Sequence, residues 1–253
     1  MTRGWQRLIL NASQAIAAHS CQPIDLTATQ SHYLYKVLRL QAGAKLVALD
    51  GKGSSWLIQV KDDKAEILER FAPGVRSNYQ VTLAIAMPKG NGMENIIKQA
   101  TEVGVSQIVP LYSDRTVVKA GTELGDQKLS RWQRIAQEAA ELAWALYLPE
   151  LLPPIAFSAW LTTVSRFDQS YICLTQPHTP HLYAQLCQAL PSPQIPIKIA
   201  ILIGAEGGWT EAEAGLALDY GCQPVSLGQQ ILSTVTAPIV ALAMVNGYLD
   251  SLA

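Results

Sequence analysis

The sequence has few charged residues, few cysteines and no cysteine pair with metal-ligand spacing. Charged residues make up 15% of the 253 positions and hydrophobic residues 49%, so the chain can bury a sizeable core and does not have the composition of a disordered protein. The four cysteines, at positions 21, 173, 187 and 222, form no C-x-x-C motif. This argues against a zinc ribbon, a thioredoxin-type motif and a disulfide framework. We therefore expect a globular protein in a reducing, cytoplasmic setting.

No apolar run is long enough to cross a membrane. The first 21 residues carry two arginines and many small side chains, but Asn11, Ser13, Gln14 and His19 interrupt the apolar core that a secretory signal needs. The longest later apolar stretch, from residue 140 to 161, contains two glutamates and three prolines. A membrane-spanning helix would not carry these together. We expect no export and no membrane partner.

Several common site motifs are also missing. Gly90 and Gly92 begin a G-x-G pattern, but Asn95 stands at the third position of the dinucleotide fingerprint. Neither G-K-[ST] nor G-x-S-x-G occurs, which argues against a phosphate loop and a hydrolase elbow. His178 and His181 are three residues apart, but Pro180 lies between them, so we interpret them as loop histidines. No metal is expected.

Charge is distributed unevenly along the chain. Residues 1–76 have a net charge of +4 and the remainder a net charge of −5. Such asymmetry is typical of an electrostatic docking domain joined to a chemistry domain, although ordinary surface scatter explains it equally well.

The first 75 residues have the pattern of a small β-barrel. Short apolar or alternating runs at 5–10, 45–49, 56–60 and 65–68 are separated by glycine and aspartate turns. Between the first two runs, a helical pattern places Tyr33, Val37 and Leu40 on one face and leaves Lys36 and Arg39 on another. A basic face on a small barrel suits RNA docking. A solvated helix face is the alternative.

From residue 76 onward, apolar strands alternate with helices. Strands are predicted at 81–88, 106–112, 169–175, 198–203 and 222–227, with helices at 93–104, 129–146 and the carboxyl terminus. This order predicts an α/β domain over residues 76–253 with a mostly parallel sheet covered on both faces.

Two strands of this domain end in glycine turns. The strand from Ile199 to Ile203 runs into Gly204, Glu206, Gly207 and Gly208, and then Thr210 and Glu213 form a capping box that opens a helix. The second such strand, 224–227, meets Gly228. Ligands of open α/β sheets bind beyond the carboxyl ends of strands, where glycines let backbone amides approach them. We expect a ligand site there, with Glu206 as its carboxylate.

At these residues the sequence resembles the RsmE-type 16S ribosomal RNA (uracil N3) methyltransferases of the SPOUT class. The resemblance covers nearly the whole chain, in the order of the family's motifs. It is carried by HYLYKVLRLQAGAKL, MPKGNGMENIIKQATEVGVSQIVPLYSDRTVVK, RWQRIAQEAAE, LIGAEGGWTEAE and SLGQQILSTVTA.

The resemblance implies a PUA-like RNA-binding β-barrel over residues 1–75, joined to a trefoil-knotted methyltransferase domain over residues 76–253. It implies S-adenosyl-L-methionine as cofactor, a homodimer, and 16S ribosomal RNA or the small ribosomal subunit as partner. The residues expected to bind the cofactor are Leu174, Ile203, Gly204, Glu206, Gly207, Gly208, Ser226, Leu227, Gly228, Ile231, Leu232, Thr234, Thr236 and Ala237. The residues expected to contact RNA are His32, Lys36, Arg39, Lys89, Arg115 and Lys119. Glu206 and Arg115 are the expected catalytic residues.

The chain departs from the family pattern at several positions where charged or polar side chains are usual. These positions are Gly92, Leu142, Ala145, Gln230, Ser233 and Val235, and Lys98 and Gln99 stand in reverse of the usual order. Fewer cations beside a polyanionic substrate weaken phosphate contacts. Two alternatives therefore stay open: a non-catalytic RNA-binding or ribosome-assembly protein that keeps the fold, and a methyltransferase with a changed target nucleotide.

Overall fold

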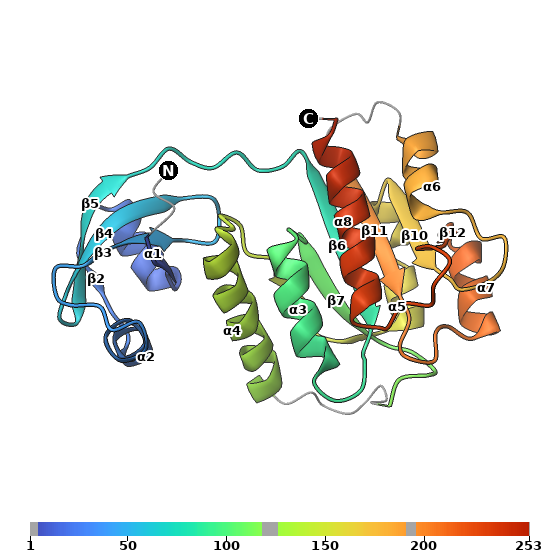
Figure 1. Ribbon diagram of the computed structural model, residues 1–253, viewed down its shortest axis with the longest axis horizontal. Helices are drawn as coiled ribbons and strands as arrows, with labels where there is room; N and C mark the ends of the chain where they lie inside the picture. The colour runs from blue at the N-terminus through green and yellow to red at the C-terminus, as the bar shows by residue number, and fades with distance from the viewer. Residues whose placement is uncertain (1–4, 118–125, 191–195, 253) are drawn as a thin grey trace. The chain divides into compact units, whose positions relative to one another are not determined.

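The computed structural model describes residues 5–117, 126–190 and 196–252 (Figure 1). It contains two compact units. The first takes in Met1–Arg76 and Ala140–Leu148, and the second takes in Ser77–Ala139 and Pro149–Ala253. The short segment 140–148 belongs to the first unit, although more than 60 residues of the sequence separate it from Arg76, where the rest of that unit ends.

The first unit is built on a five-stranded sheet with the strand order β1-β3-β4-β5-β2. Strands β3, β4 and β5 form antiparallel pairs, as expected for short runs joined by tight turns, and β1 pairs with β3 in parallel. The elements are β1 (Arg7–Ile9), α1 (Ala12–His19), β2 (Ile24–Asp25), α2 (Ala28–His32), the π-helix η1 (Tyr33–Val37), β3 (Lys45–Leu49), β4 (Ser55–Lys61) and β5 (Lys64–Arg70).

The core of the first unit is centred on Trp56, whose side chain is completely buried. Leu8, Leu34, Leu46 and Ile58 are buried in the same cluster. A second cluster covers the other side of the sheet, where Ile9, Val47 and Leu49 pack against Trp144, Leu146 and Leu148. The segment 140–148 thus supplies apolar cover that the first 76 residues lack.

Asp50 holds the turn between β3 and β4. Its carboxylate accepts the amide hydrogens of Lys52 and Ser54 at 2.8 and 2.9 Å, and His19 Nε2 lies 3.3 Å from its other oxygen. Burial acts to raise the pKa of Asp50, but these hydrogen bonds outweigh it and the pKa is lowered. A carboxyl whose pKa is lower in the folded protein stabilises the fold above a pH of about 4, and this contribution is lost as the pH falls further.

We expect Asp50→Asn to destabilise the protein by about 1 kcal/mol at pH 7, because the neutral amide accepts the same two hydrogen bonds less strongly. The difference from the unsubstituted protein should be smaller at pH 3 than at pH 7, because Asp50 loses its charge as the pH falls through its lowered pKa. Urea unfolding at both pH values measures this. A difference that stays constant from pH 7 to pH 3 would show that the charge of Asp50 contributes nothing.

The second unit has a seven-stranded sheet flanked by helices. Its elements are β6 (Tyr79–Ala86), α3 (Gly92–Glu102), β7 (Gln107–Tyr112), α4 (Asp126–Ala143), β8 (Glu150–Leu151), β9 (Ile155–Ala156), α5 (Phe157–Leu161), the 3-10 helix η2 (Val164–Arg166), β10 (Gln169–Cys173), α6 (Leu182–Ala189), β11 (Ile197–Ile203), α7 (Glu211–Asp219), β12 (Gln223–Val225) and α8 (Thr236–Asp250). The last four residues of α4 belong to the first unit.

All strand pairings described within this sheet are parallel. The strand order is β12-β10-β11-β6-β7-β8, and β9 also pairs with β7. The parallel arrangement confirms the α/β architecture predicted for this part of the chain. It also brings the carboxyl ends of β10, β11, β12, β6 and β7 to one edge of the sheet.

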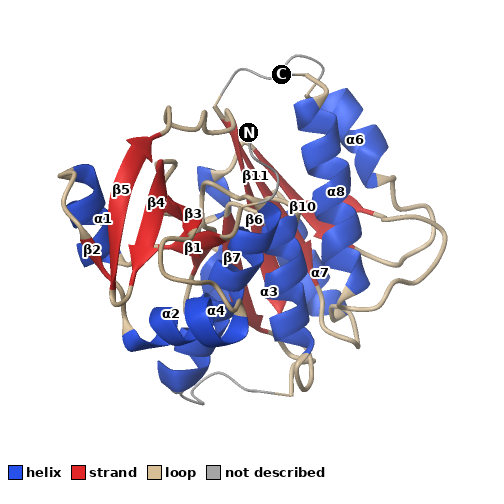
Figure 2. Cartoon of the chain, turned by 60° about the vertical axis from the view of Figure 1, so that its left-hand side comes forward, coloured by secondary structure: helices blue, strands red, loops and turns tan. Residues whose placement is uncertain are grey.

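The central strands are buried on both faces, which explains why they read as nearly continuous apolar runs. In β11, Ile199 and Ile201 belong to one core cluster, and Ala200 and Leu202 belong to the other. The first cluster is covered by α3, α6 and α8, and the second by α5 and α7. Figure 2 shows α3 and α8 side by side on one face of the sheet. Among the described helices, none combines the length and the apolar character needed to cross a membrane.

Candidate active site

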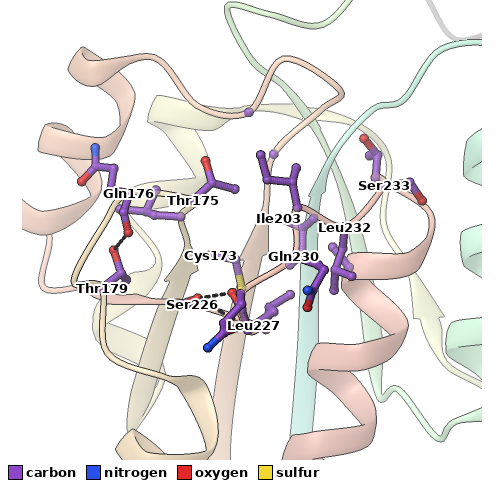
Figure 3. A pocket seen from close by; sticks show the side chains of 18 of the residues that line it. Cys173, Thr175, Gln176, Thr179, Ile203, Ser226, Leu227, Gln230, Leu232 and Ser233 are labelled. Atoms are coloured by element: carbon purple, nitrogen blue, oxygen red, sulfur yellow. Dashed lines mark hydrogen bonds between the residues drawn. The ribbon is translucent and has the colours of Figure 1, made fainter.

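A cavity of about 850 Å³ lies at the carboxyl ends of β10, β11 and β12 (Figure 3). Three loops line it: residues 173–179, 203–208 and 226–234, together with Ala237 at the start of α8. The cavity therefore lies where a parallel sheet is expected to place its ligand.

The loop after β11 is a tight glycine turn. The amide of Gly208 donates to the carbonyl of Ala205 at 2.8 Å. A methyl group added to Gly204 would lie 3.0 Å from both the Cα and the carbonyl carbon of Gly208. Because these are backbone atoms, a side chain at position 204 can be accommodated only if the backbone of the turn shifts, so the turn favours glycine there.

The helix that follows this turn begins as the sequence predicts. The Thr210 hydroxyl accepts the amide hydrogen of Glu213 at 3.1 Å, and the Glu213 carboxylate accepts the amide hydrogen of Thr210 at 2.9 Å. The predicted capping box is thus confirmed, and it fixes the point where the cavity loop ends and α7 starts.

The loop after β12 is closed by Ser226. Its hydroxyl accepts the amide hydrogen of Gly228 at 3.2 Å and donates to the Gly228 carbonyl at 3.0 Å. Gly228 has a φ of +132°, which residues with a side chain rarely adopt. The second predicted glycine corner therefore also has a backbone conformation suited to glycine.

The loop after β10 is tied to the loop after β12. The amide of Ser226 donates to the Pro180 carbonyl at 2.8 Å, and the amide of Leu182 donates to the Ser226 carbonyl at 2.9 Å. Within the loop, the Thr179 hydroxyl donates to the Gln176 carbonyl at 2.8 Å (Figure 3). Cys173 ends β10 at the wall of the cavity, and burial raises the pKa of its thiol to about 12. This thiol is therefore protonated and unreactive at neutral pH.

Glu206 is the one carboxylate among the residues that line the cavity, which include no lysine or arginine. Its Oε1 accepts the amide hydrogen of Lys89 at 3.0 Å. This bond joins the turn after β6 to the turn after β11. The carboxylate itself is exposed, so it can also meet a ligand or substrate.

Arg115 lies beside the same turn. Its guanidinium donates to the Gly207 carbonyl, and a methyl group on Gly207 would lie 3.0 Å from the Arg115 Cδ. Arg115 is exposed and does not line the cavity itself. The structure thus brings Glu206, Lys89 and Arg115 together at one glycine turn.

Thirteen of the fourteen residues expected to bind the cofactor line this cavity. The exception is Thr236, whose hydroxyl lies 2.9 Å from that of Ser233. Ser233 also accepts the amide hydrogens of Thr236 and, through its carbonyl, of Ala237. These two residues therefore organise the start of α8 next to the cavity.

The residues expected to contact RNA fall in both units. His32, Lys36 and Arg39 are exposed in the first unit, where they follow one another through α2, η1 and the residues just after it. Arg39 has a φ of +55°, the left-handed conformation that commonly ends a helix. Lys89 and Arg115 are exposed in the second unit. Lys119 lies outside the described residues.

The departures from the family pattern lie in three places. Gln230 and Ser233 line the cavity, whereas Leu142 and Ala145 belong to the first unit. Gly92 and Val235 are neighbours, since a methyl group on Gly92 would lie 3.7 Å from Val235 Cγ2. The same methyl group would approach Pro88 to 2.9 Å, so the packing here favours glycine at position 92.

The sequence motifs did not identify most of the loop after β10. Five residues of this loop line the cavity, Thr175, Gln176, Pro177, His178 and Thr179, whereas Pro180 in the sequence predicts no more than a loop around His178. Only the strand order places this loop at the cavity. The loop follows β10, which pairs in parallel with β11 and β12, so the carboxyl end of β10 lies beside the two glycine turns.

In the part of the chain that the structure describes, no group of three or more His, Cys, Asp or Glu side chains is placed to hold a metal ion.

Comparison with known proteins gives consistent matches over both units. A family described as "RNA methyltransferase domain" matches residues 75–246, and one described as "RNA methyltransferase PUA domain" matches residues 26–69. These matches agree with the expected PUA-like and methyltransferase architecture.

Individual relatives agree with the family matches. The ribosomal RNA small subunit methyltransferase E of Synechocystis sp. is 41% identical over 97% of this chain and 78% of its own length. The protein of the same name from Bacillus subtilis is 27% identical over 88% of this chain and 89% of its own length. The crystal structure of a ribosomal RNA small subunit methyltransferase E from Neisseria gonorrhoeae bound to S-adenosyl methionine matches with a TM-score of 0.79 and 28% identity. That match covers 96% of this chain and 97% of that one.

Proposed function

The chain belongs to the ribosomal RNA small subunit methyltransferase E family, and we propose that it transfers a methyl group from S-adenosyl-L-methionine to N3 of a uridine in 16S ribosomal RNA. The observation that carries this proposal is the cavity at the carboxyl ends of β10, β11 and β12, where thirteen residues expected to bind the cofactor come together.

The cavity suits this cofactor in size and lining. Its volume of about 850 Å³ lies within the range of about 300 to 1,000 Å³ usual for small-molecule sites. Leu174, Ile203, Leu227 and Leu232 offer apolar surface to an adenine ring, and the glycine turns offer backbone amides to polar groups. The lone carboxylate, Glu206, suits the positive charge of a sulfonium or ammonium group. When bound, the cofactor supplies an electrophilic methyl group.

The uridine N3 must lose a proton before it can attack a methyl group. An imide nitrogen that carries a proton is a poor nucleophile, so the site must either accept the proton or stabilise the anion that remains. We assign stabilisation of the anion to the Arg115 guanidinium, the cation beside the Gly207 carbonyl. Glu206 holds the Lys89 amide and orients the uridine or the cofactor. The rest of the rate acceleration comes from holding the two reactants in line.

We expect Arg115→Ala to lower kcat/KM for methyl transfer by about 100-fold, as is typical when a donor that stabilises a developing anion is removed. Glu206→Gln should lower it by about tenfold, because the neutral amide still accepts the Lys89 amide hydrogen but lacks the charge. The assay measures transfer of labelled methyl from S-adenosyl-L-methionine to small ribosomal subunits.

Matched controls are Arg166→Ala and Glu211→Gln. Both residues are exposed in the second unit, and neither lines the cavity. We expect both controls to have the activity of the unsubstituted enzyme. If Arg115→Ala and Glu206→Gln also turn over at the unsubstituted rate, the two assignments are wrong.

The two parts of the chain have different roles in this function. We propose that residues 1–75 dock the RNA and that residues 76–253 hold the cofactor. The net charge of +4 on residues 1–76 and the exposed His32, Lys36 and Arg39 support the first role. We further propose a homodimer acting in the cytoplasm. In α8, the small apolar residues Ala243 and Gly247 are exposed, which supports helix packing between two copies.

A further inference from the structure

Glu213 is a buried carboxylate whose two oxygens bind different parts of the second unit. The residue is 6% exposed. Its Oε2 accepts the amide hydrogen of Thr210 at 2.9 Å, in the capping box at the start of α7. Its Oε1 accepts the amide hydrogen of Asp114 at 2.8 Å, and Asp114 follows β7, 99 residues earlier in the chain. The carboxylate therefore joins the start of α7 to the turn after β7.

The capping box alone does not require a carboxylate. The helices α1 and α2 also begin with capping boxes, and the third helical residue in each is a glutamine, Gln14 and Gln30. The side-chain nitrogen of Gln14 donates to the Asp25 carbonyl at 2.7 Å, so the end of the side chain that does not cap the helix meets an acceptor. The corresponding end of Glu213 meets an N–H donor and must itself be an acceptor. Glutamate at position 213 therefore matches the Asp114 amide as well as α7.

The turn that Glu213 holds is closed by its own hydrogen bonds. The Thr116 hydroxyl donates to the Ser113 carbonyl at 2.7 Å and accepts the Ser113 amide hydrogen at 3.2 Å. The Thr116 amide donates to the same carbonyl at 3.1 Å. Ser113 and Thr116 are both buried. Arg115 lies within this four-residue turn, so the backbone of Arg115 is fixed when the turn as a whole is fixed.

Two hydrogen bonds connect this turn with the segment from Gly207 to Glu213. One is the exposed bond from the Arg115 guanidinium to the Gly207 carbonyl, and the other is the bond from the Asp114 amide to the buried Glu213 carboxylate. Both bonds include a charged group, but water competes for the exposed guanidinium far more than for the buried carboxylate. The Asp114–Glu213 bond therefore decides where the turn lies, and the side chain of Arg115 starts from that position.

We propose that Glu213 is a positioning residue for Arg115: by holding the Asp114 amide, it keeps the Arg115 guanidinium beside the Gly207 turn. Glu213 does not line the cofactor cavity, and both of its oxygens have partners within the protein, so it acts through Arg115 and not on the substrate or the cofactor. A displacement of about 1 Å can lower a reaction rate by about 100-fold. This inference rests on the proposed function, which assigns stabilisation of the uridine anion to Arg115.

Glu213→Gln breaks the bond to Asp114 and keeps the helix cap. The amide oxygen can still accept the Thr210 amide hydrogen, as the glutamines of α1 and α2 do in their capping boxes, but the amide nitrogen cannot accept the Asp114 amide hydrogen. We expect kcat/KM for methyl transfer to fall about tenfold and the Kd for S-adenosyl-L-methionine to stay unchanged. Glu211→Gln is the matched control, because Glu211 is an exposed carboxylate in the same first turn of α7. Equal turnover by the two variants would overturn the proposal.

A double-mutant cycle distinguishes positioning of Arg115 from a purely structural role of Glu213. Arg115→Ala leaves no guanidinium to position, so adding Glu213→Gln to it should lower kcat/KM by less than about twofold further. If the two losses multiply instead, Glu213 acts independently of Arg115 and the proposal is wrong. Glu213→Asp gives the same test should Glu213→Gln not fold. It keeps the charge, but its shorter side chain cannot span the amides of Thr210 and Asp114 together, so we expect the same loss and the same cycle.

Amide hydrogen exchange, followed by NMR, separates this proposal from the proposed function because it needs neither cofactor nor activity. In Glu213→Gln we expect the Asp114 amide to exchange at least about tenfold faster, while the Thr210 amide stays protected. Unchanged protection of Asp114 would overturn the proposal. Absent methyl transfer by the unsubstituted protein, with protection of Asp114 that still depends on Glu213, would defeat the function and retain the bond. Normal methyl transfer by Glu213→Gln, with that protection lost, would retain the function and defeat the positioning role.

Discussion

Gly204→Val should lower the affinity for S-adenosyl-L-methionine by at least about 100-fold, which corresponds to about 2.7 kcal/mol, and should abolish methyl transfer. The branched side chain would be forced against the backbone of Gly208, since even a single methyl group would lie 3.0 Å from its Cα and carbonyl carbon. The turn must then open. Opening it displaces the backbone and the Glu206 carboxylate, which line one wall of the cavity. Isothermal titration calorimetry measures the affinity.

Gly215→Val is the matched control for this prediction. Gly215 lies in α7, shortly after the same turn, and a methyl group there would meet no atom within 4 Å. Valine has a higher helix propensity than glycine, so this variant should be at least as stable as the unsubstituted protein. We expect it to bind the cofactor normally. Equal affinities of the two variants would show that the glycine turn does not shape the cofactor site.

Trp56→Ala should destabilise the first unit by about 3 to 5 kcal/mol, the usual cost of removing a buried tryptophan. Its side chain is completely buried at the centre of that unit's core. A unit this small buries limited apolar surface and has little stability to spare. We therefore expect loss of RNA binding, with cofactor binding by the second unit retained. Filter binding of 16S ribosomal RNA and calorimetry with S-adenosyl-L-methionine measure the two activities in the same variant.

Trp56→Phe tests whether the effect of Trp56→Ala comes from the lost apolar volume or from the lost indole N–H group. The indole N–H of Trp56 is buried without a partner among the described residues, so phenylalanine removes an unpaired donor and keeps most of the apolar volume. We expect this variant to bind RNA nearly as well as the unsubstituted protein. Unchanged RNA binding by Trp56→Ala would mean that the first unit is not the docking unit.

The sheet of the second unit could be predicted because its central strands have strong, simple patterns. The run from Ile199 to Ile203 is apolar throughout, and the structure buries both of its faces. The turn at Gly204 and the capping box of Thr210 and Glu213 mark where this strand ends and α7 begins. Local signals of this kind depend on neighbouring residues only, so the sequence carries them without any tertiary information.

The parts that could not be predicted depend on contacts between distant residues. Nothing in the sequence around Leu146 and Leu148 indicates that they pack with Ile9 and Val47 in the first unit. The helix Ala12–His19 was also missed, although Asn11 and Gln14 form its capping box, because its small residues give weak amphipathic periodicity.

The cofactor cavity was predicted in outline because two glycine corners are visible in the sequence. The loop after β10 supplies another wall of this cavity, and no motif in that loop indicates it. Only the parallel strand order, which is a tertiary property, brings such segments to one edge of the sheet.

The most direct test of this account is nucleoside mass spectrometry of 16S ribosomal RNA after incubation of small ribosomal subunits with the purified protein and isotopically labelled S-adenosyl-L-methionine. We expect one labelled N3-methyluridine, absent when the cofactor is omitted and strongly reduced with Gly204→Val. A labelled methyl group on a different nucleotide would contradict the assigned target. No label in the RNA, with the cofactor nevertheless bound, would contradict the assignment as an RNA methyltransferase.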